Sequence, residues 1–281
     1  TACAAAGKAP PAGGTTTLIE MICPGPSDEP VAAFETWKSK AEGLAAVDYT
    51  FHMSVVRFEE RIRDQFREIV KAGVASFKVF LAYKGALNLS DEDLFAAMKF
   101  AKDLGVIVTA HCENADAIDA LQKSLLAAGN TGPEWHGPSR PPVVEADGVH
   151  HLCTFAELLG THVYIVHTSC AAALREALGA RQRGVNVWIE SVIPHFVLDE
   201  TAVEKAQFEG AKYVMSPPLR AKANQDVLWN GVKTRQISTI ATDPSDVTTI
   251  SSTVGSGFTI MFTDMRPVDS SRWMSILGRG T

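Results

Sequence analysis

Short runs of β-branched and apolar residues alternate along this chain with segments in which apolar positions recur at helical spacing. The apolar runs, each of a length typical of a strand, lie at residues 14–22, 48–56, 76–83, 106–113, 163–169, 185–192 and 237–243. The segments with helical periodicity lie at 31–42, 58–71, 91–104, 116–128, 144–159, 171–183 and 224–234. Seven candidate strands separated by helices predict an α/β fold with a parallel sheet, and the chain length fits one (β/α)8 barrel.

Two segments carry further local signals. Ser90 precedes the acidic residues of SDED and is typical of a helix N-cap, since acidic side chains in a first turn favour the helix dipole. Gly105 is expected to end that helix. The Pro- and Gly-rich loop 131–142, TGPEWHGPSRPP, interrupts the alternation and carries Trp135, His136 and Arg140 at its centre. A long loop of this kind is either a lid or oligomer contact, or a solvated connection.

Composition excludes several classes of protein. The 281 residues carry a formal net charge of −6 and no run of Lys or Arg, which argues against a nucleic-acid-binding surface. No apolar stretch is long enough to cross a bilayer, and the alanine-rich start lacks the order of a signal peptide. The five cysteines contain no CxxC pair, so we expect a reduced, cytoplasmic setting.

Four polar residues lie at or just past the ends of predicted strands: Lys78, His111, His167 and Asp243. In a (β/α)8 barrel these ends converge on one mouth, where the chemistry of such enzymes takes place. A buried lysine must be paired, neutral or modified, and a neutral amine can react with CO2 to give an anionic carbamate. A salt-bridged lysine is the ordinary alternative, and a single histidine at a strand end is more often a packed or surface residue than a ligand.

The four residues together indicate a hydrolytic metal site. Imidazole nitrogen and carboxylate oxygen are ligands that suit zinc. Asp243 can both bind a metal and take the proton from a metal-bound water.

Eight motifs resemble those of one family, the cyclic amidohydrolases that include the dihydropyrimidinases and D-hydantoinases. They are SFKVFLAYKG, TAHCEN, TGPEWHGPSRPP, VHTSCAAAL, WIESVIPHFVLDE, EGAKYVMSPPLR, VLWNGV and ISTIATD, and the resemblance runs from about residue 13 to 243. It implies a TIM barrel of the metal-dependent hydrolase type with a small flanking β domain. It also implies hydrolysis of hydantoins or dihydropyrimidines to N-carbamoyl amino acids, and assembly into homotetramers.

The same resemblance implies roles for particular residues. Lys78, as a CO2-derived carbamate, would bridge two divalent metal ions, expected to be zinc, together with a hydroxide. His111 and His167 would bind the second metal, and Asp243 would bind the first and act as general base and acid. Tyr83 would stabilise the oxyanion, and the Ser216 main chain would hold the cyclic amide. Two nearby thiols, those of Cys112 and Cys170, are expected to pack rather than to react.

The chain also departs from the family pattern. The His-x-His pair that ends the family's first strand is not found, since the chain begins after its expected place, and the flanking domain is missing. We therefore expect residues 1–243 to form a partial barrel and 244–281 to be a divergent C-terminal part. We also expect the natural polypeptide to be longer, and the alternative is a truncated, inactive relative. A barrel without its first strand should leave two strands with unpaired edges. The neighbouring His150 and His151 are expected on a solvated helix face.

Other functions stay open at this point. Allantoinase and dihydroorotase are the alternatives within the same class of enzyme. A second class is a non-catalytic dihydropyrimidinase-like scaffold that binds no metal, which zinc analysis would distinguish. A third is a phosphate-binding isomerase barrel, for which VGSGF at 254–258 is a weak signal.

Overall fold

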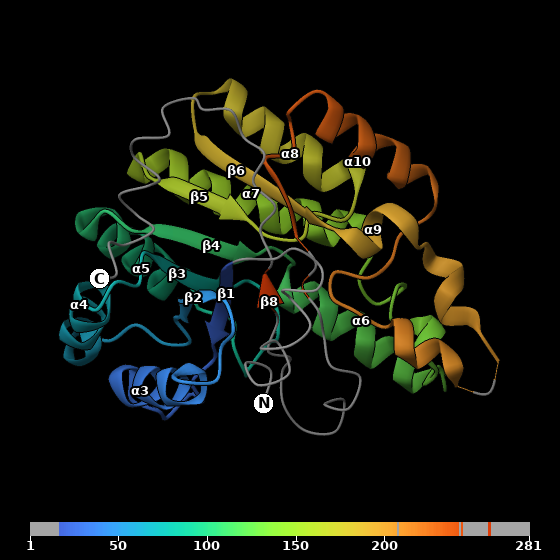
Figure 1. Ribbon diagram of the computed structural model, residues 1–281. Helices are drawn as coiled ribbons and strands as arrows, with labels where there is room; N and C mark the ends of the chain where they lie inside the picture. The colour runs from blue at the N-terminus through green and yellow to red at the C-terminus, as the bar shows by residue number, and fades with distance from the viewer. Residues whose placement is uncertain (1–16, 207, 242, 244–257, 260–281) are drawn as a thin grey trace.

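The computed structural model describes residues 17–206, 208–241, 243 and 258–259 (Figure 1). These residues form a curled sheet in the order β7-β6-β5-β4-β3-β2-β1-β8. The first seven strands are parallel and neighbour one another in chain order. Their bounds are β1 (Thr17–Ile22), β2 (Asp48–Ser54), β3 (Ser76–Phe80), β4 (Ile107–His111), β5 (His162–Ile165), β6 (Asn186–Val192) and β7 (Thr239–Ala241). The predicted fold class, a partial (β/α)8 barrel with seven parallel strands, is confirmed.

Helices connect the strands and cover the outer side of the sheet (Figure 1). The α-helices are α3 (Pro30–Ala41), α4 (Arg63–Lys71), α5 (Asp91–Leu104), α6 (Ala115–Ala127), α7 (Pro142–Leu159), α8 (Ala171–Gln182), α9 (Ile193–Val197) and α10 (Ala223–Lys233). Short 3-10 helices are η1 (Glu60–Ile62), η2 (Pro133–Trp135), η3 (Glu200–Glu204) and η4 (Glu209–Tyr213). None of the helices in the described ranges is long and apolar enough to span a membrane.

The boundaries of α5 follow its sequence signals. The Ser90 hydroxyl accepts a hydrogen bond from the Asp93 amide at 3.1 Å, which caps the first turn as predicted. Gly105 ends the helix with φ of 71°, in the left-handed region that glycine adopts without steric strain. The helix predicted from residue 58 instead begins as η1 and continues as α4 from Arg63.

One edge of the sheet, which the sequence analysis predicted to be unpaired, has a partner strand. Strand β8 (Phe258–Thr259) pairs antiparallel with β1, opposite Glu20 and Ile19. The outer edge of β1 is therefore covered in part, not unpaired. The tail 244–281 otherwise lies outside the described residues, and so do residues 254–257 of VGSGF.

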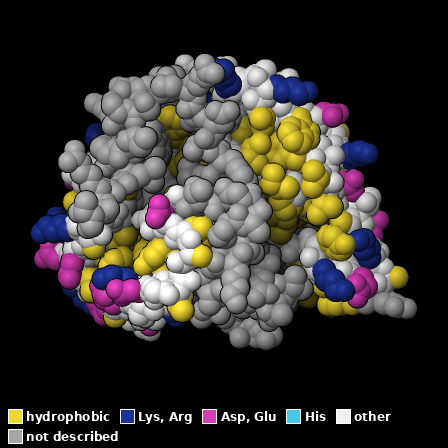
Figure 2. Space-filling model, viewed as in Figure 1, with side chains coloured by type: hydrophobic (Ala, Val, Ile, Leu, Met, Phe, Trp, Pro, Cys, Tyr) yellow, Lys and Arg dark blue, Asp and Glu magenta, His cyan; other side chains and the backbone are white. Residues whose placement is uncertain are grey.

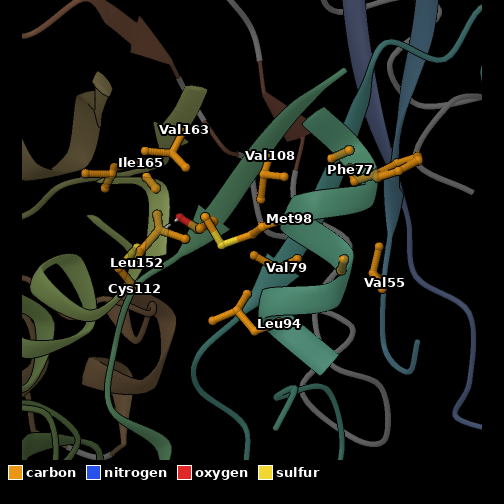
Figure 3. Close-up of a cluster of buried hydrophobic side chains, with 14 of the residues drawn as sticks. Val55, Phe77, Val79, Leu94, Met98, Val108, Cys112, Leu152, Val163 and Ile165 are labelled. Atoms are coloured by element: carbon orange, nitrogen blue, oxygen red, sulfur yellow. Dashed lines mark hydrogen bonds between the residues drawn. The ribbon is translucent and has the colours of Figure 1, made fainter. Parts of the chain in front are cut away.

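The hydrophobic core lies between the sheet and its helices. Val79 of β3, Val108 of β4 and Ile165 of β5 gather with Met98 of α5 and Leu152 of α7 (Figure 3). All five side chains are at most 1% exposed. Burial on this scale holds the helices against the strands, and it fixes which face of each strand points away from them.

Apolar side chains also gather on part of the outer surface. Figure 2 shows them on the face that carries α9 and α10. Exposed residues of these helices include Ile193, Val197, Val227 and Trp229. An apolar surface of this kind is a candidate for contact with another protein chain.

Candidate active site

Strand alternation places Lys78 inside the curve of the sheet. Phe77 and Val79 belong to the core beneath α5, and successive strand residues point to opposite faces. Lys78 therefore points to the face away from the helices, although all five residues of β3 are buried. The same alternation places His111 on that inner face, because Val108 and Ala110 of β4 belong to the core.

Lys78 is 1% exposed, as the apolar run around it predicted. Burial lowers the pKa of its amine to about 8, while the charges of Asp243 and Glu190 act in the opposite direction. Burial in turn raises the pKa of Asp243 to about 6, and Lys78 opposes this shift. Lysine and aspartate are thus electrostatically coupled, and a neutral amine able to form a carbamate is accessible near neutral pH.

The structure brings the two predicted histidines together. His111 ends β4, His167 follows β5, and His111 Nδ1 lies 3.0 Å from His167 Nε2. Both side chains are buried, and burial lowers the pKa of each imidazole well below 6.5, with the charge of Lys78 adding to the effect. Both imidazoles are therefore neutral at pH 7, which is the form that binds metal ions.

Backbone strain marks several predicted site residues. Tyr83, His167 and Asp243 have φ of 65°, 41° and 41°, in the left-handed region that non-glycine residues rarely adopt. Each follows the end of a strand, where the chain turns across the mouth of the sheet. Strained backbone that is retained at such positions is typical of functional sites.

Tyr83 lies beside His111, and Ser216 contacts Tyr83. The Tyr83 ring is 5.1 Å from the His111 ring, measured between centroids. Burial raises the pKa of the Tyr83 phenol to about 12, so the hydroxyl stays a hydrogen-bond donor at neutral pH, and Ser216 acts in the opposite direction as a hydrogen-bond partner. Ser216 is half-buried, and its hydroxyl lies 3.2 Å from His136 Nε2.

The loop 131–142 is part of the site rather than a solvated connection. His136 Nε2 donates a hydrogen bond to the Met215 carbonyl at 2.8 Å. Arg140 is 4% exposed, and its guanidinium lies 5.4 Å from the centre of the Tyr83 ring. The sequence alone did not decide between a lid or oligomer contact and a solvated connection, because a Pro- and Gly-rich composition does not reveal which polar side chains are buried.

Two buried glutamates belong to the site but received no role from the sequence. Glu190 of β6 accepts hydrogen bonds from the Tyr164 hydroxyl at 2.7 Å and from the His167 amide at 3.2 Å. Burial raises its pKa to about 7. Glu113 follows β4 and lies 2.6 Å from His111 Nε2. The signal for Glu190 was present in WIESV, where an acid interrupts an apolar strand as Lys78 does.

Other sequence expectations can be placed directly. Cys112 and Cys170 are buried, and burial raises the pKa of each thiol, which agrees with packing rather than nucleophilic roles. His150 is exposed on α7, and the neighbouring His151 is half-buried against Phe155. The solvated-face prediction is therefore confirmed for His150 and holds in part for His151.

The donor groups fit zinc only when Lys78 contributes. Within the described ranges, the His, Cys, Asp and Glu side chains do not by themselves form a group of three or more able to hold a metal ion. The facing nitrogens of His111 and His167 supply two donors, and His167 Nδ1 has no hydrogen-bond partner among the described residues. As a carbamate, Lys78 would supply an oxygen donor, and nitrogen and oxygen together suit zinc.

Comparison with known proteins identifies relatives of this chain. No family model matches the chain. It is 41% identical over 232 residues to a D-hydantoinase of Geobacillus stearothermophilus, an alignment that covers 82% of this chain and 49% of that protein. It is 38% identical over 227 residues to a dihydropyrimidinase of Arabidopsis thaliana, covering 79% of this chain and 42% of that protein. The chain belongs to the D-hydantoinase and dihydropyrimidinase family. The family resemblance predicted from the motifs is thereby confirmed.

Solved structures of the D-hydantoinase and dihydropyrimidinase family support the same assignment. A D-hydantoinase from Thermus sp. superposes with a TM-score of 0.85 and 50% identity, covering 88% of this chain and 54% of that one. A dihydropyrimidinase from Brevibacillus agri gives a TM-score of 0.81 and 41% identity, covering 86% of this chain and 51% of that one. This chain therefore spans about half the length of the relatives it matches.

Proposed function

We propose that this chain carries the catalytic barrel of a hydrolase that opens cyclic amides, hydantoins or dihydropyrimidines, to N-carbamoyl amino acids. Family membership supports the class of reaction. The observation that carries the proposal is the pair of facing, neutral imidazoles of His111 and His167 on the same inner face as the buried Lys78. A scaffold without chemistry has no need for these three groups on one buried face.

The proposed cofactors are two divalent metal ions, and zinc is the first candidate. Lys78 as a carbamate, His111, His167 and Asp243 would hold them. When bound, such ions lower the pKa of water towards neutrality and polarise the carbonyl that is attacked. The pKa of Asp243, raised to about 6, and the pKa of Lys78, lowered to about 8, support this donor set, because burial brings both values towards neutral pH, where the neutral amine that a carbamate requires is accessible.

The chain's own residues have three further proposed tasks. Asp243, with a pKa of about 6, takes a proton from the attacking water and passes it to the ring nitrogen as the carbon–nitrogen bond breaks. The Tyr83 hydroxyl, still protonated at neutral pH, donates a hydrogen bond to the oxyanion on the former carbonyl. The main chain of Ser216 orients the ring amide.

The oligomeric state and the cellular compartment are proposed on separate grounds. A homotetramer is supported by the exposed apolar surface on α9 and α10. A reducing, cytoplasmic setting is supported by the described cysteines, which are Cys23, Cys112, Cys153 and Cys170 and are all free thiols. Light scattering of the purified chain tests the first, and a single species at the monomer mass would contradict it.

Hydrolysis assays test the catalytic proposal. The purified chain, loaded with Zn²⁺ in bicarbonate buffer, should consume hydantoin or dihydrouracil faster than allantoin or dihydroorotate. Lys78→Ala should lose bound zinc and turnover together. Turnover and zinc content that both survive this substitution would contradict the assignment. Zinc binding without turnover of any of the four rings would instead leave a metal-binding protein of another function.

A further inference from the structure

His111 has a second partner on the side away from His167. Its Nε2 atom lies 2.6 Å from Oε2 of Glu113, a side chain with no exposed area. Arg140 Nη1 lies 2.6 Å from the same oxygen, and Arg140 is also buried. The imidazole is thus linked through one carboxylate to a guanidinium that comes from the loop 131–142.

This chain of contacts fixes where the imidazole carries its proton. Arginine stays charged in proteins, so the buried pair is electrically balanced only when Glu113 is a carboxylate. A carboxylate accepts hydrogen bonds and cannot donate one, so His111 must donate through Nε2–H. A neutral imidazole has a single N–H, which leaves a lone pair on Nδ1. That lone pair points towards His167 Nε2, 3.0 Å away.

We propose that Glu113, held by Arg140, is a positioning residue that keeps His111 in the tautomer whose Nδ1 lone pair faces the metal position. This inference rests on the proposed function, since it assumes that His111 is a metal ligand. Carboxylates that accept the second N–H of a ligating histidine orient the ring and make it a better donor. Glu113 would therefore act on the metal only through His111.

The loop 131–142 has a defined task in this arrangement. Arg220 Nη2 pairs with Glu145 at 2.8 Å, and the same guanidinium donates to the Arg140 carbonyl. The Arg140 backbone is therefore fixed to the barrel, and its side chain reaches between Glu113 and the Tyr83 ring. The loop delivers the cation that keeps Glu113 ionised at the end of β4.

The tautomer can be measured without any assay of turnover. In the full chain labelled with 15N-histidine and freed of metal by chelation, two-bond 1H–15N correlations should show His111 protonated on Nε2. The signals are assigned by their loss in His111→Gln. A His111 protonated on Nδ1 in the wild-type chain would overturn the proposal, whatever any variant does.

The variant that tests the role removes both charges together, so that no unpaired ion stays buried. Glu113→Gln with Arg140→Met should populate both His111 tautomers and weaken Zn²⁺ binding by about 10- to 100-fold, measured by titration of the folded chain. The control is Glu157→Gln with Arg183→Met, a glutamate–arginine pair between α7 and the end of α8 whose hydrogen bond involves neither His111 nor the loop 131–142. It should keep the His111 tautomer and the zinc affinity.

The outcomes separate this inference from the proposed function. If the Glu113 variant keeps one tautomer and wild-type zinc affinity, the positioning role is wrong, even where the ring substrates are hydrolysed. If tautomer and affinity change as expected while none of the four rings is hydrolysed, the positioning role stands and the proposed reaction fails.

Discussion

His111 and His167 stand 56 positions apart in the chain, yet Nδ1 of the first lies 3.0 Å from Nε2 of the second. Neighbouring parallel strands produce this proximity, because β4 and β5 are paired and both histidines follow the same end of the sheet. Both imidazoles are neutral at pH 7, because burial lowers the pKa of each well below 6.5. Two neutral donors that face each other favour one shared cation.

Removing one donor of the pair should therefore remove zinc. His167→Asn should weaken Zn²⁺ binding by at least about tenfold, because the pair then offers a single imidazole. The measurement is zinc content after dialysis against dilute chelator, with a titration of the stripped chain. His150→Asn, at an exposed position on α7, is the control and should bind zinc as the wild type does. Equal zinc loss in both variants would contradict the assignment of His167 as a ligand.

The acidic limb of the pH profile should report Asp243. Its pKa is raised to about 6 by burial, and a carboxyl group must lose its proton before it can accept one from water. We expect kcat/KM for the ring substrate to fall once the pH drops below the pKa of Asp243, which a bound cation would hold below the value of about 6 that burial alone gives. Asp243→Asn should reduce kcat by about 10²- to 10⁴-fold at every pH. Asp103→Asn, exposed on α5, should change neither quantity, and an unaltered acidic limb in Asp243→Asn would rule Asp243 out as the base.

A histidine outside the proposed ligand set should contribute to the loss of stability in acid. His52 of β2 is buried beside Ser76, and burial lowers its pKa to about 3, with Lys78 adding to the effect. Below pH 6.5 the unfolded chain binds a proton at this residue that the folded chain does not, so stability is lost as the pH falls. Between pH 6.5 and 5 the loss should be about 2 kcal/mol from this group alone. Urea unfolding of the metal-free chain at both pH values checks this.

The matched variant for that measurement is His52→Gln, which cannot be protonated. The free energy of unfolding should fall less between pH 6.5 and 5 in the variant than in the wild type. The comparison uses the difference between the two slopes, so any loss of packing that is independent of pH cancels. Parallel slopes in the two chains would show that His52 is not the group responsible.

The sequence predicted the strands better than it predicted where they end. The apolar runs at 76–83 and 163–169 continue past β3 and β5, which end at Phe80 and Ile165. Most of these extra residues are buried, whether apolar as Ala82 and Val166 or polar as Thr168, although the backbone there turns through the positive φ of Tyr83 and His167. Apolar patterning reports burial, and burial extends beyond hydrogen-bonded strand at this end of the barrel.

The candidate site was predictable to the extent that it depends on strand ends. Lys78, His111 and His167 follow from their place in apolar runs. The contact between Glu113 and Arg140 could not be predicted, because it depends on how the loop 131–142 folds back onto the end of β4. Helix α9 was also missed, since five residues that include Pro194 show too little periodicity to indicate a helix.

Close packing of α7 against the end of β4 gives the most local test of the site. A Cβ added at Gly148 would lie 2.6 Å from the Cys112 carbonyl carbon and 2.7 Å from the Glu113 nitrogen, which is closer than atoms can pack. Gly148→Ala must therefore displace the peptide between Cys112 and Glu113, which directly follows His111. We expect a loss of about 1–3 kcal/mol in the free energy of unfolding and weaker zinc binding.

A second glycine distinguishes this contact from helix propensity. Among the residues that the structure describes, a Cβ added at Gly179 of α8 would meet only the Arg183 guanidinium, at 3.7 Å. Gly179→Ala should therefore gain up to about 1 kcal/mol, because alanine favours helix over glycine, and should leave zinc affinity unchanged. Urea unfolding and Zn²⁺ titration of both variants make the comparison. If Gly148→Ala proves as stable and binds zinc as tightly as Gly179→Ala, then α7 does not position the His111–Glu113 segment, and the geometry proposed for the metal site loses its main support on that side.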